Sequence, residues 1–112
     1  NIQRLNNKAE AMALRKALRG DNLCDICRLR VGSEYHEIVP RSKTIARDDL
    51  REASFAPEIC SLLCRECHDK IAPTKRGIEL LLECNINLYG KAKVKTALEK
   101  IPDRFRLGIE IR

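Results

Sequence analysis

Two CxxC motifs, Cys24–Cys27 and Cys64–Cys67, constrain this chain more than any other feature, and 36 residues separate them. Two intervening residues let both sulfurs of a motif reach one metal ion at about 2.3 Å, and two such motifs complete a tetrahedron. Polar residues flank the cysteines, which argues against four reduced thiols in an apolar core. Redox chemistry of the thioredoxin type requires a βαβ pattern that this sequence does not offer. We therefore predict one structural zinc ion held by Cys24, Cys27, Cys64 and Cys67.

The size of the chain makes such an ion important for folding. Its 112 residues suffice for one domain with one modest core. A metal ion that joins two distant segments therefore contributes directly to stability. The other two cysteines, Cys60 and Cys84, stand among apolar residues, and we expect both to be ordinary buried cysteines.

The N-terminal residues carry a charge every few positions, which is unlike a signal peptide, and no apolar run is long enough to span a membrane. Clustered thiols without a secretory signal are typical of a reducing compartment. We therefore expect an intracellular protein, cytoplasmic or nucleoid-associated, with no membrane partner.

The first two segments of the chain differ in pattern. Residues 1–20 predict a basic amphipathic helix, because apolar residues recur at spacings of three and four and Gly20 stands where a C-terminal cap is expected. Residues 21–72 contain both CxxC motifs and a short β-like stretch at residues 34–39. The zinc-binding core is therefore expected within residues 21–72.

Residues 73–112 predict a C-terminal helical extension. One helix is expected to end near Gly90, and Pro102 is expected to stop a second one. The tail from Phe105 to Ile111 alternates apolar and polar residues, which is the period of a half-buried strand. We expect it to form an edge strand that pairs within the domain or with a second chain.

Within residues 22–72, the CxxC motif is followed by HEIVPRS at residues 36–42 and by LLCRECHDKI at residues 62–71. This combination resembles the HNH endonucleases (ββα-metal or His-Me finger) of the zinc-knuckle type. The resemblance implies a small zinc-knuckle ββα-metal core. Together with the helices that the periodicity predicts at both ends and the C-terminal edge strand, the expected fold class is α+β. It also implies a catalytic divalent metal, Mg²⁺, Mn²⁺ or another, besides the structural zinc.

The resemblance also assigns candidate catalytic residues. His36 takes the position of the first metal ligand, and His68, directly after Cys67, takes that of the ligand on the helix. The general-base position, which is His in the family, is occupied by Glu37. A carboxylate with a pKa near about 4.3 is ionised but weakly basic. A shift of one residue would make His36 the base and Glu34 or Glu37 the ligand, but side chains alternate along a strand, so this shift requires a bulge.

Two further positions depart from the family pattern, because Ile59 replaces the Asn that orients the base and Ala72 replaces the second ligand on the helix. The sequence therefore favours a zinc-stabilised DNA-binding protein with weak or absent nuclease activity. The alternative is an active metal-dependent DNA endonuclease or nickase that uses His36, Glu37 and His68. A second alternative is a protein-docking module built on the same fold.

Basic residues exceed acidic ones by six, and basic side chains bind the phosphate backbone. Four thiolates on one Zn²⁺ would lower the net charge to about +4. Residues 1–20 hold five basic residues and one acidic residue, so this helix is the main candidate for DNA contact. Lysines at 91, 93, 95 and 100 are interpreted as a solvated helix face. The residues expected to contact nucleic acid are Arg4, Lys8, Arg15, Lys16, Arg19, Arg41, Lys43, Arg65 and Lys70.

Only four aromatic residues are present, which argues against a stacking platform for single strands. Duplex or branched DNA is therefore the expected partner. The terminal helices or the tail at residues 105–111 would serve a protein partner or a second copy of the chain.

Overall fold

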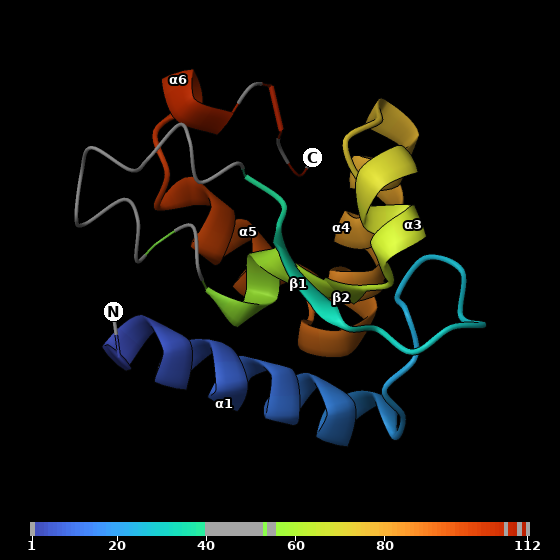
Figure 1. Cartoon of the computed structure of the whole chain (residues 1–112). Coiled ribbons are helices and arrows are strands. Elements are labelled where there is room, and N and C mark those ends of the chain that lie inside the picture. Colours follow the sequence, from blue (N-terminus) through green and yellow to red (C-terminus); the bar gives the residue numbers. More distant parts are fainter. Residues whose placement is uncertain (1, 40–52, 54–55, 107, 110, 112) are drawn as a thin grey trace.

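The fold is organised around two short antiparallel strands, β1 (Glu34–Glu37) and β2 (Cys60–Leu63). The computed structural model describes residues 2–39, 53, 56–106, 108–109 and 111, and it describes their side chains except those of residues 2–7 and 105. Helix α1 (Ile2–Arg19) precedes the strands, and the short turn η2 (Pro57–Ile59) leads into β2. The helices that follow are α3 (Arg65–Lys70), α4 (Lys75–Tyr89), α5 (Lys91–Glu99) and α6 (Asp103–Arg106) (Figure 1). The predicted α+β class is therefore confirmed.

The register of the two strands decides which side chains share a face. Glu34 lies opposite Leu63, and His36 lies opposite Ser61. Because successive side chains in a strand point to opposite faces, Glu34 and His36 share one face, while Tyr35 and Glu37 share the other. Helix α3 packs against β1 and begins directly after β2.

The apolar core lies between the sheet and the helices α4 and α5. Thr74 caps α4 by accepting a hydrogen bond from the backbone N–H of Gly77 at 3.0 Å. A Cβ atom at Gly77 would collide with the carbonyl group of Ile71, so this glycine lets α4 begin close against the end of α3. The largest apolar side chains that are fully buried are Ile59, Leu62, Leu63, Leu81, Val94, Leu98 and Ile101.

Two helix ends agree with the expectations from sequence. Gly20 has a φ of +79°, and its N–H donates to the carbonyl of Lys16 at 2.8 Å, so it caps α1. Gly90, with a φ of +92°, separates α4 from α5. Glycine suits both positions because it adopts positive φ without steric cost.

The predicted edge strand from Phe105 to Ile111 is wrong for the residues that the structure describes. Asp103–Arg106 forms the short helix α6, and residues 108, 109 and 111 belong to no strand. Ile109, which is 7% exposed, instead belongs to the core cluster, and Ile111 packs against that cluster. At these two described positions the apolar side chain contacts the core without strand pairing. No described helix has the length and apolar character that a membrane crossing requires.

A buried arginine fixes α1 to the rest of the domain. Arg15 is 1% exposed, and its Nε lies 2.7 Å from a carboxylate oxygen of Asp25, which is itself fully buried. The Arg15 guanidinium also donates to the carbonyl of Cys60 at 3.1 Å and to the side chain of Asn85 at 2.7 Å. One side chain on α1 therefore joins the first CxxC motif, strand β2 and helix α4.

Replacement of Arg15 tests this arrangement. Arg15→Ala leaves Oδ1 of the buried Asn85 without its donor and removes one donor each from the Asp25 carboxylate and the Cys60 carbonyl, and we expect it to lower the free energy of unfolding by about 3 kcal/mol or more. The exposed neighbour gives a matched control, because Lys16→Ala should change stability by less than about 0.5 kcal/mol. Urea unfolding of the zinc-loaded proteins measures both values, and equal losses in the two variants would contradict the role of Arg15.

Candidate metal centre and histidine cluster

The four cysteines of the two CxxC motifs come together in the fold. Their sulfur atoms all lie within 4.8 Å of one another, and the sulfurs of Cys27 and Cys64 are 4.0 Å apart. Sulfurs on one tetrahedral zinc ion are about 3.8 Å apart, so a small contraction brings them to that geometry. This cluster can hold a structural metal ion, and its four thiols are consistent with zinc.

A tight turn after α1 presents the first two cysteines. The N–H of Cys24 donates to the carbonyl of Arg30 at 2.8 Å, and the N–H of Arg28 donates to the carbonyl of Cys24 at 3.0 Å. Arg28 adopts a φ of +57°, which lets the chain fold back after Cys27. Asp21 receives two hydrogen bonds from the Arg28 guanidinium, which holds this turn in place and lowers the pKa of the Asp21 carboxyl.

The second pair sits at the junction between β2 and α3. Cys64 is the N-cap of α3, and its sulfur accepts from the backbone N–H of Cys67 at 3.5 Å. That N–H lowers the pKa of the Cys64 thiol, and the Arg30 guanidinium at 3.5 Å acts in the same direction. Because Cys64 caps α3 and Cys67 lies in its first turn, the sulfurs of Cys64 and Cys67 lie close together.

The protein environment shifts the pKa values of the Cys27 and Cys67 thiols in opposite directions. The backbone N–H groups of Arg30 and Leu29 lower the pKa of Cys27 to about 6. Burial raises the pKa of Cys67 to about 12. A metal ion displaces the proton from such a thiol, because metal ions bind the thiolate form. The site is therefore suited to a metal ion and less so to four neutral thiols.

Asp25, inside the first CxxC motif, connects this cluster to its surroundings. Its carboxylate accepts from the N–H of Leu62 at 2.8 Å, and its own N–H donates to the carbonyl of Leu62 at 2.9 Å. Arg15 and Arg19 both pair with the same carboxylate, at 2.7 and 3.0 Å. The sequence pattern shows Asp25 only as one of the polar residues beside the cysteines. An acidic residue that closely follows an arginine-rich helix indicates an ion pair, and this is the pattern that predicts its role.

A second group of titratable side chains lies where α3 meets β1. Nδ1 of His68 is 2.6 Å from Oε1 of Glu34, and the ring centroids of His36 and His68 are 4.9 Å apart. The contact with His68 lowers the pKa of Glu34, so this carboxylate is ionised at neutral pH. Burial, with a smaller contribution from His68, lowers the pKa of His36 to about 4, so its imidazole is uncharged at neutral pH.

The structure brings together His36 and His68 from the predicted catalytic set, and it places Glu37 elsewhere. Strand alternation puts Glu37 on the opposite face of β1, so the acidic residue beside the histidines is Glu34. Glu37 cannot act beside His36 without a bulge, because adjacent side chains of a strand point to opposite faces. Glu34 is two residues from His36 and shares its face, so no bulge is needed for Glu34. Ile59 and Ala72 are 0% and 1% exposed, so both are core residues.

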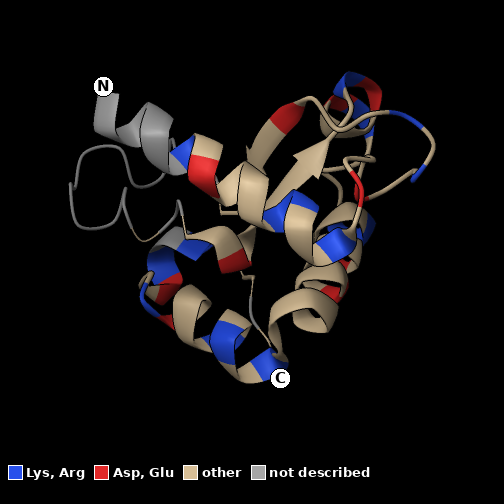
Figure 2. Ribbon diagram, turned by 90° about the horizontal axis from the view of Figure 1, so that it is seen from below, with Lys and Arg blue, Asp and Glu red and all other residues tan. Residues whose placement is uncertain are grey.

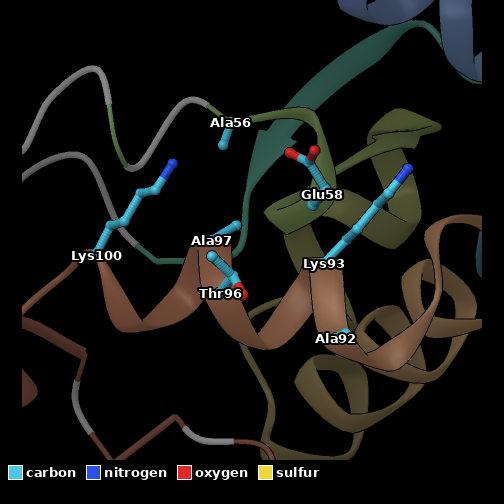
Figure 3. A pocket seen from close by; sticks show the side chains of 7 residues that line it. All are labelled: Ala56, Glu58, Ala92, Lys93, Thr96, Ala97 and Lys100. Atoms are coloured by element: carbon cyan, nitrogen blue, oxygen red, sulfur yellow. The ribbon is translucent and has the colours of Figure 1, made fainter.

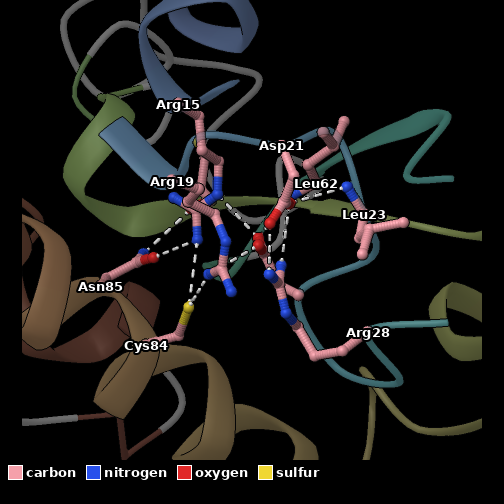
Figure 4. Close-up of polar contacts among 10 residues, drawn as sticks. Arg15, Arg19, Asp21, Leu23, Arg28, Leu62, Cys84 and Asn85 are labelled. Carbon is pink, nitrogen blue, oxygen red and sulfur yellow. Dashed lines mark hydrogen bonds and ion pairs between the residues drawn. The ribbon is translucent and has the colours of Figure 1, made fainter. Parts of the chain in front are cut away.

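Several residues expected to contact nucleic acid have other roles. The prediction for Arg15 is corrected, because its guanidinium is buried and already bonded. Arg19 is also engaged, since its side chain is 14% exposed and pairs with Asp25. Figure 4 shows both arginines directed toward α4, where Arg19 lies 2.6 Å from the sulfur of Cys84. Charge repetition along a helix cannot tell a buried cation from a solvated one.

The other members of the predicted set divide into three groups. Arg41 and Lys43 lie outside the described residues, as does the side chain of Arg4. Lys16 is exposed and Lys8 is half-buried. Arg65 and Lys70 are 79% and 73% exposed, but each is within 4 Å of carboxylates, and these belong to Glu34, Glu66 and Asp69.

The two cysteines outside the cluster differ from one another. Cys60 is fully buried in β2, as expected. Cys84 is only half-buried on α4, and its sulfur accepts hydrogen bonds from Arg19 and Arg15. The expectation of an ordinary buried cysteine is therefore corrected for Cys84, because its environment is polar.

In comparisons with known proteins, the chain matches no protein-family model, no curated protein and no solved structure.

Removal of one thiol tests the metal centre. Cys24→Ser or Cys64→Ser should abolish tight zinc binding and the cooperative unfolding transition, because the ion joins segments that are distant in sequence. Cys84→Ser should keep one zinc per chain, since Cys84 lies outside the cluster. Elemental analysis and circular dichroism measure zinc content and folding. A Cys64→Ser protein with full zinc content and an unchanged unfolding curve would contradict the assignment.

Proposed function

We propose that this protein is a zinc-stabilised, HNH-like DNA-binding domain with weak or absent nuclease activity. The observation that carries the proposal is the order β1, β2, α3, with the second CxxC motif at the start of α3 and His36 set 4.9 Å from His68. This is the arrangement that the ββα-metal resemblance implies. A net excess of basic residues supports a polyanionic partner.

Three features support weak catalysis. Glu37 lies on the strand face away from the histidines, so it is poorly placed to act with them. Ile59 and Ala72 fill core positions where the family has polar groups. In the assignment shifted by one residue, His36 would be a poor base, because a pKa of about 4 is far below neutral pH.

A specific observation favours the second candidate, a metal-dependent endonuclease or nickase. An ionised Glu34 at 2.6 Å from Nδ1 of His68 takes the hydrogen bond from that nitrogen, which leaves the Nε2 lone pair for a metal ion. Two imidazoles that bind one ion at about 2.1 Å have ring centres about 5 Å apart, which is close to the separation of His36 and His68.

The donor set of this second site indicates which ions suit it. Two imidazole ligands suit Mn²⁺, Ni²⁺ or Zn²⁺ better than Mg²⁺, which prefers oxygen ligands, and the Glu34 carboxylate is already engaged with His68. When bound, such an ion would polarise the phosphate and stabilise the leaving oxygen. The chain's own contribution is to hold His68 in one orientation through Glu34 and to keep His36 uncharged.

Binding to a labelled DNA duplex tests the main proposal. We expect the zinc-loaded protein to bind at low salt, with log Kd rising by about 0.9 per log unit of salt for each phosphate contact. Fluorescence anisotropy across a salt series measures this slope. A protein that binds neither duplex nor branched DNA at low salt would contradict the proposal, and a search for protein partners would then follow.

Incubation with supercoiled plasmid separates the two candidates. With Mg²⁺, Mn²⁺ or Ni²⁺ we expect little or no nicking, and any genuine activity should fall at least tenfold in His68→Ala and His36→Ala. Glu34→Gln should reduce such activity less, because the amide can still hold His68 in place. Rapid cleavage that both histidine variants abolish would establish the endonuclease alternative. Cleavage that neither variant affects would point to a contaminating enzyme.

A further inference from the structure

Helix α5 carries the largest group of unpaired positive charges in the described part of the chain. Its lysines are all exposed, and none has an ion pair among the described residues. Glu99 is the single acidic residue between positions 91 and 100. Three further unpaired lysines are spread over α1 and α4. The four lysines of the α5 surface are Lys91, Lys93, Lys95 and Lys100.

Basic residues elsewhere are largely neutralised. Lys and Arg residues occur on several elements of the molecule, so their position alone does not single out a surface (Figure 2). The ion pairs distinguish the surfaces, because most of the described arginines are paired with carboxylates. A paired cation attracts a phosphate less strongly. The paired residues are Arg15, Arg19, Arg28, Arg30, Arg65, Lys70, Arg76 and Arg106.

The helical period arranges the α5 lysines in two rows. Val94, Ala97 and Leu98 face the core, so the opposite side of the helix faces solvent. At 100° per residue, Lys93 and Lys100 fall on one flank, while Lys91 and Lys95 fall on the other. The side chains between the rows are Ala92, Thr96 and Glu99. Ala92 and Thr96 are small and let an extended polyanion approach the helix closely, and Glu99 is the single carboxylate among the four lysines.

One flank borders a cavity of about 390 Å³ between α5 and η2. Lys93, Thr96 and Lys100 line it, and both lysines extend to the side of α5 where Glu58 lies (Figure 3). The two lysines and Glu58 give this edge a net positive charge, and the Thr96 hydroxyl can donate a further hydrogen bond. The two lysines are two helical turns apart, about 10 Å along the axis, a distance over which duplex DNA presents several phosphates.

The start of α5 adds to the positive potential. Gly90 provides no side-chain cap, and the first turn contains no acidic residue. The partial positive charge of the helix N-terminus is therefore not offset, and Lys91 and Lys93 add to it.

We propose that the α5 surface contacts the phosphate backbone of duplex DNA through Lys91, Lys93, Lys95 and Lys100. This inference rests on the proposed DNA-binding function and replaces residues 1–20 as the main contact. It also replaces the interpretation of these lysines as a merely solvated face. Contacts of this kind give affinity without sequence preference.

The composition of the α5 surface favours nucleic acid over other polyanionic partners. The centres of protein–protein interfaces are depleted in lysine and enriched in aromatic residues, and this surface has none. Binding to a bilayer surface by an amphipathic helix requires large apolar side chains on the face that inserts. Between its lysine rows α5 offers Ala92, Thr96 and Glu99 and no large apolar side chain, while its leucine and valine are buried.

A pair of charge-matched triple variants tests the location of the contact. The first carries Lys93→Ala, Lys95→Ala and Lys100→Ala. The control carries Lys16→Ala, Lys70→Ala and Lys75→Ala, which remove the same charge from exposed positions on other helices. Affinity for a short labelled duplex is measured by anisotropy between about 50 and 200 mM salt. Zinc content and circular dichroism verify that each variant is folded.

We expect the α5 variant to bind at least tenfold more weakly at the lowest salt and to lose about two to three units of salt slope. The control should lose less than about one unit. The single variant Lys95→Ala should lose about one unit, which keeps the test valid if the triple variant misfolds. Equal losses in both triple variants, or a larger loss in the control, would overturn the α5 assignment while DNA binding itself stands.

Two other results would also overturn the inference, and both can be distinguished from the result that DNA binds to a different surface of the protein. Wild-type protein that does not bind DNA at any salt concentration would overturn the proposed function and this inference together. Wild-type protein that binds vesicles of phosphatidylserine and phosphatidylcholine, but not DNA, would identify the α5 lysines as a surface for lipid headgroups.

Discussion

The buried carboxylate of Asp25 is the group on which the arrangement of the domain depends. A fully buried carboxylate needs hydrogen bonds and a positive partner, and Arg15 and Arg19 supply the charge. Because Asp25 lies between Cys24 and Cys27, these contacts also orient the first half of the metal centre. Its two hydrogen bonds with the backbone of Leu62 then fix that half beside β2, from which Cys64 follows. Docking of α1 and assembly of the cysteine cluster are therefore physically linked.

This link changes the electrostatic description of the molecule. The N-terminal helix is basic by composition, yet two of its arginines act inside the protein. Within the part of the chain that the structure describes, the largest group of cations without a carboxylate partner lies on α5. Net charge per segment is thus a poor guide to a binding surface unless the pairing of each cation is known.

The parts that sequence predicts well are those set by local chemistry. The cysteine cluster follows from motif spacing, and the ends of α1 and α4 follow from Gly20 and Gly90. The parts that sequence misses depend on contacts between distant segments. Arg15 and Asn85 are 70 residues apart, and no local pattern marks them as partners. Alternation in the tail predicts a strand, but Asp103–Arg106 forms α6 and Ile109 packs against the core. Likewise, strand register selects Glu34 over Glu37 as the neighbour of the histidines.

Four thiols meet at the junction of α1, β2 and α3, and we propose that they hold one zinc ion as thiolates. X-ray absorption at the zinc edge of the purified protein tests this claim most directly, because zinc–sulfur and zinc–nitrogen shells differ in length by about 0.2–0.3 Å. We expect four sulfur ligands at about 2.3 Å and no nitrogen or oxygen bound to the ion. A shell that contains histidine nitrogen, or a folded protein without bound zinc, would contradict it.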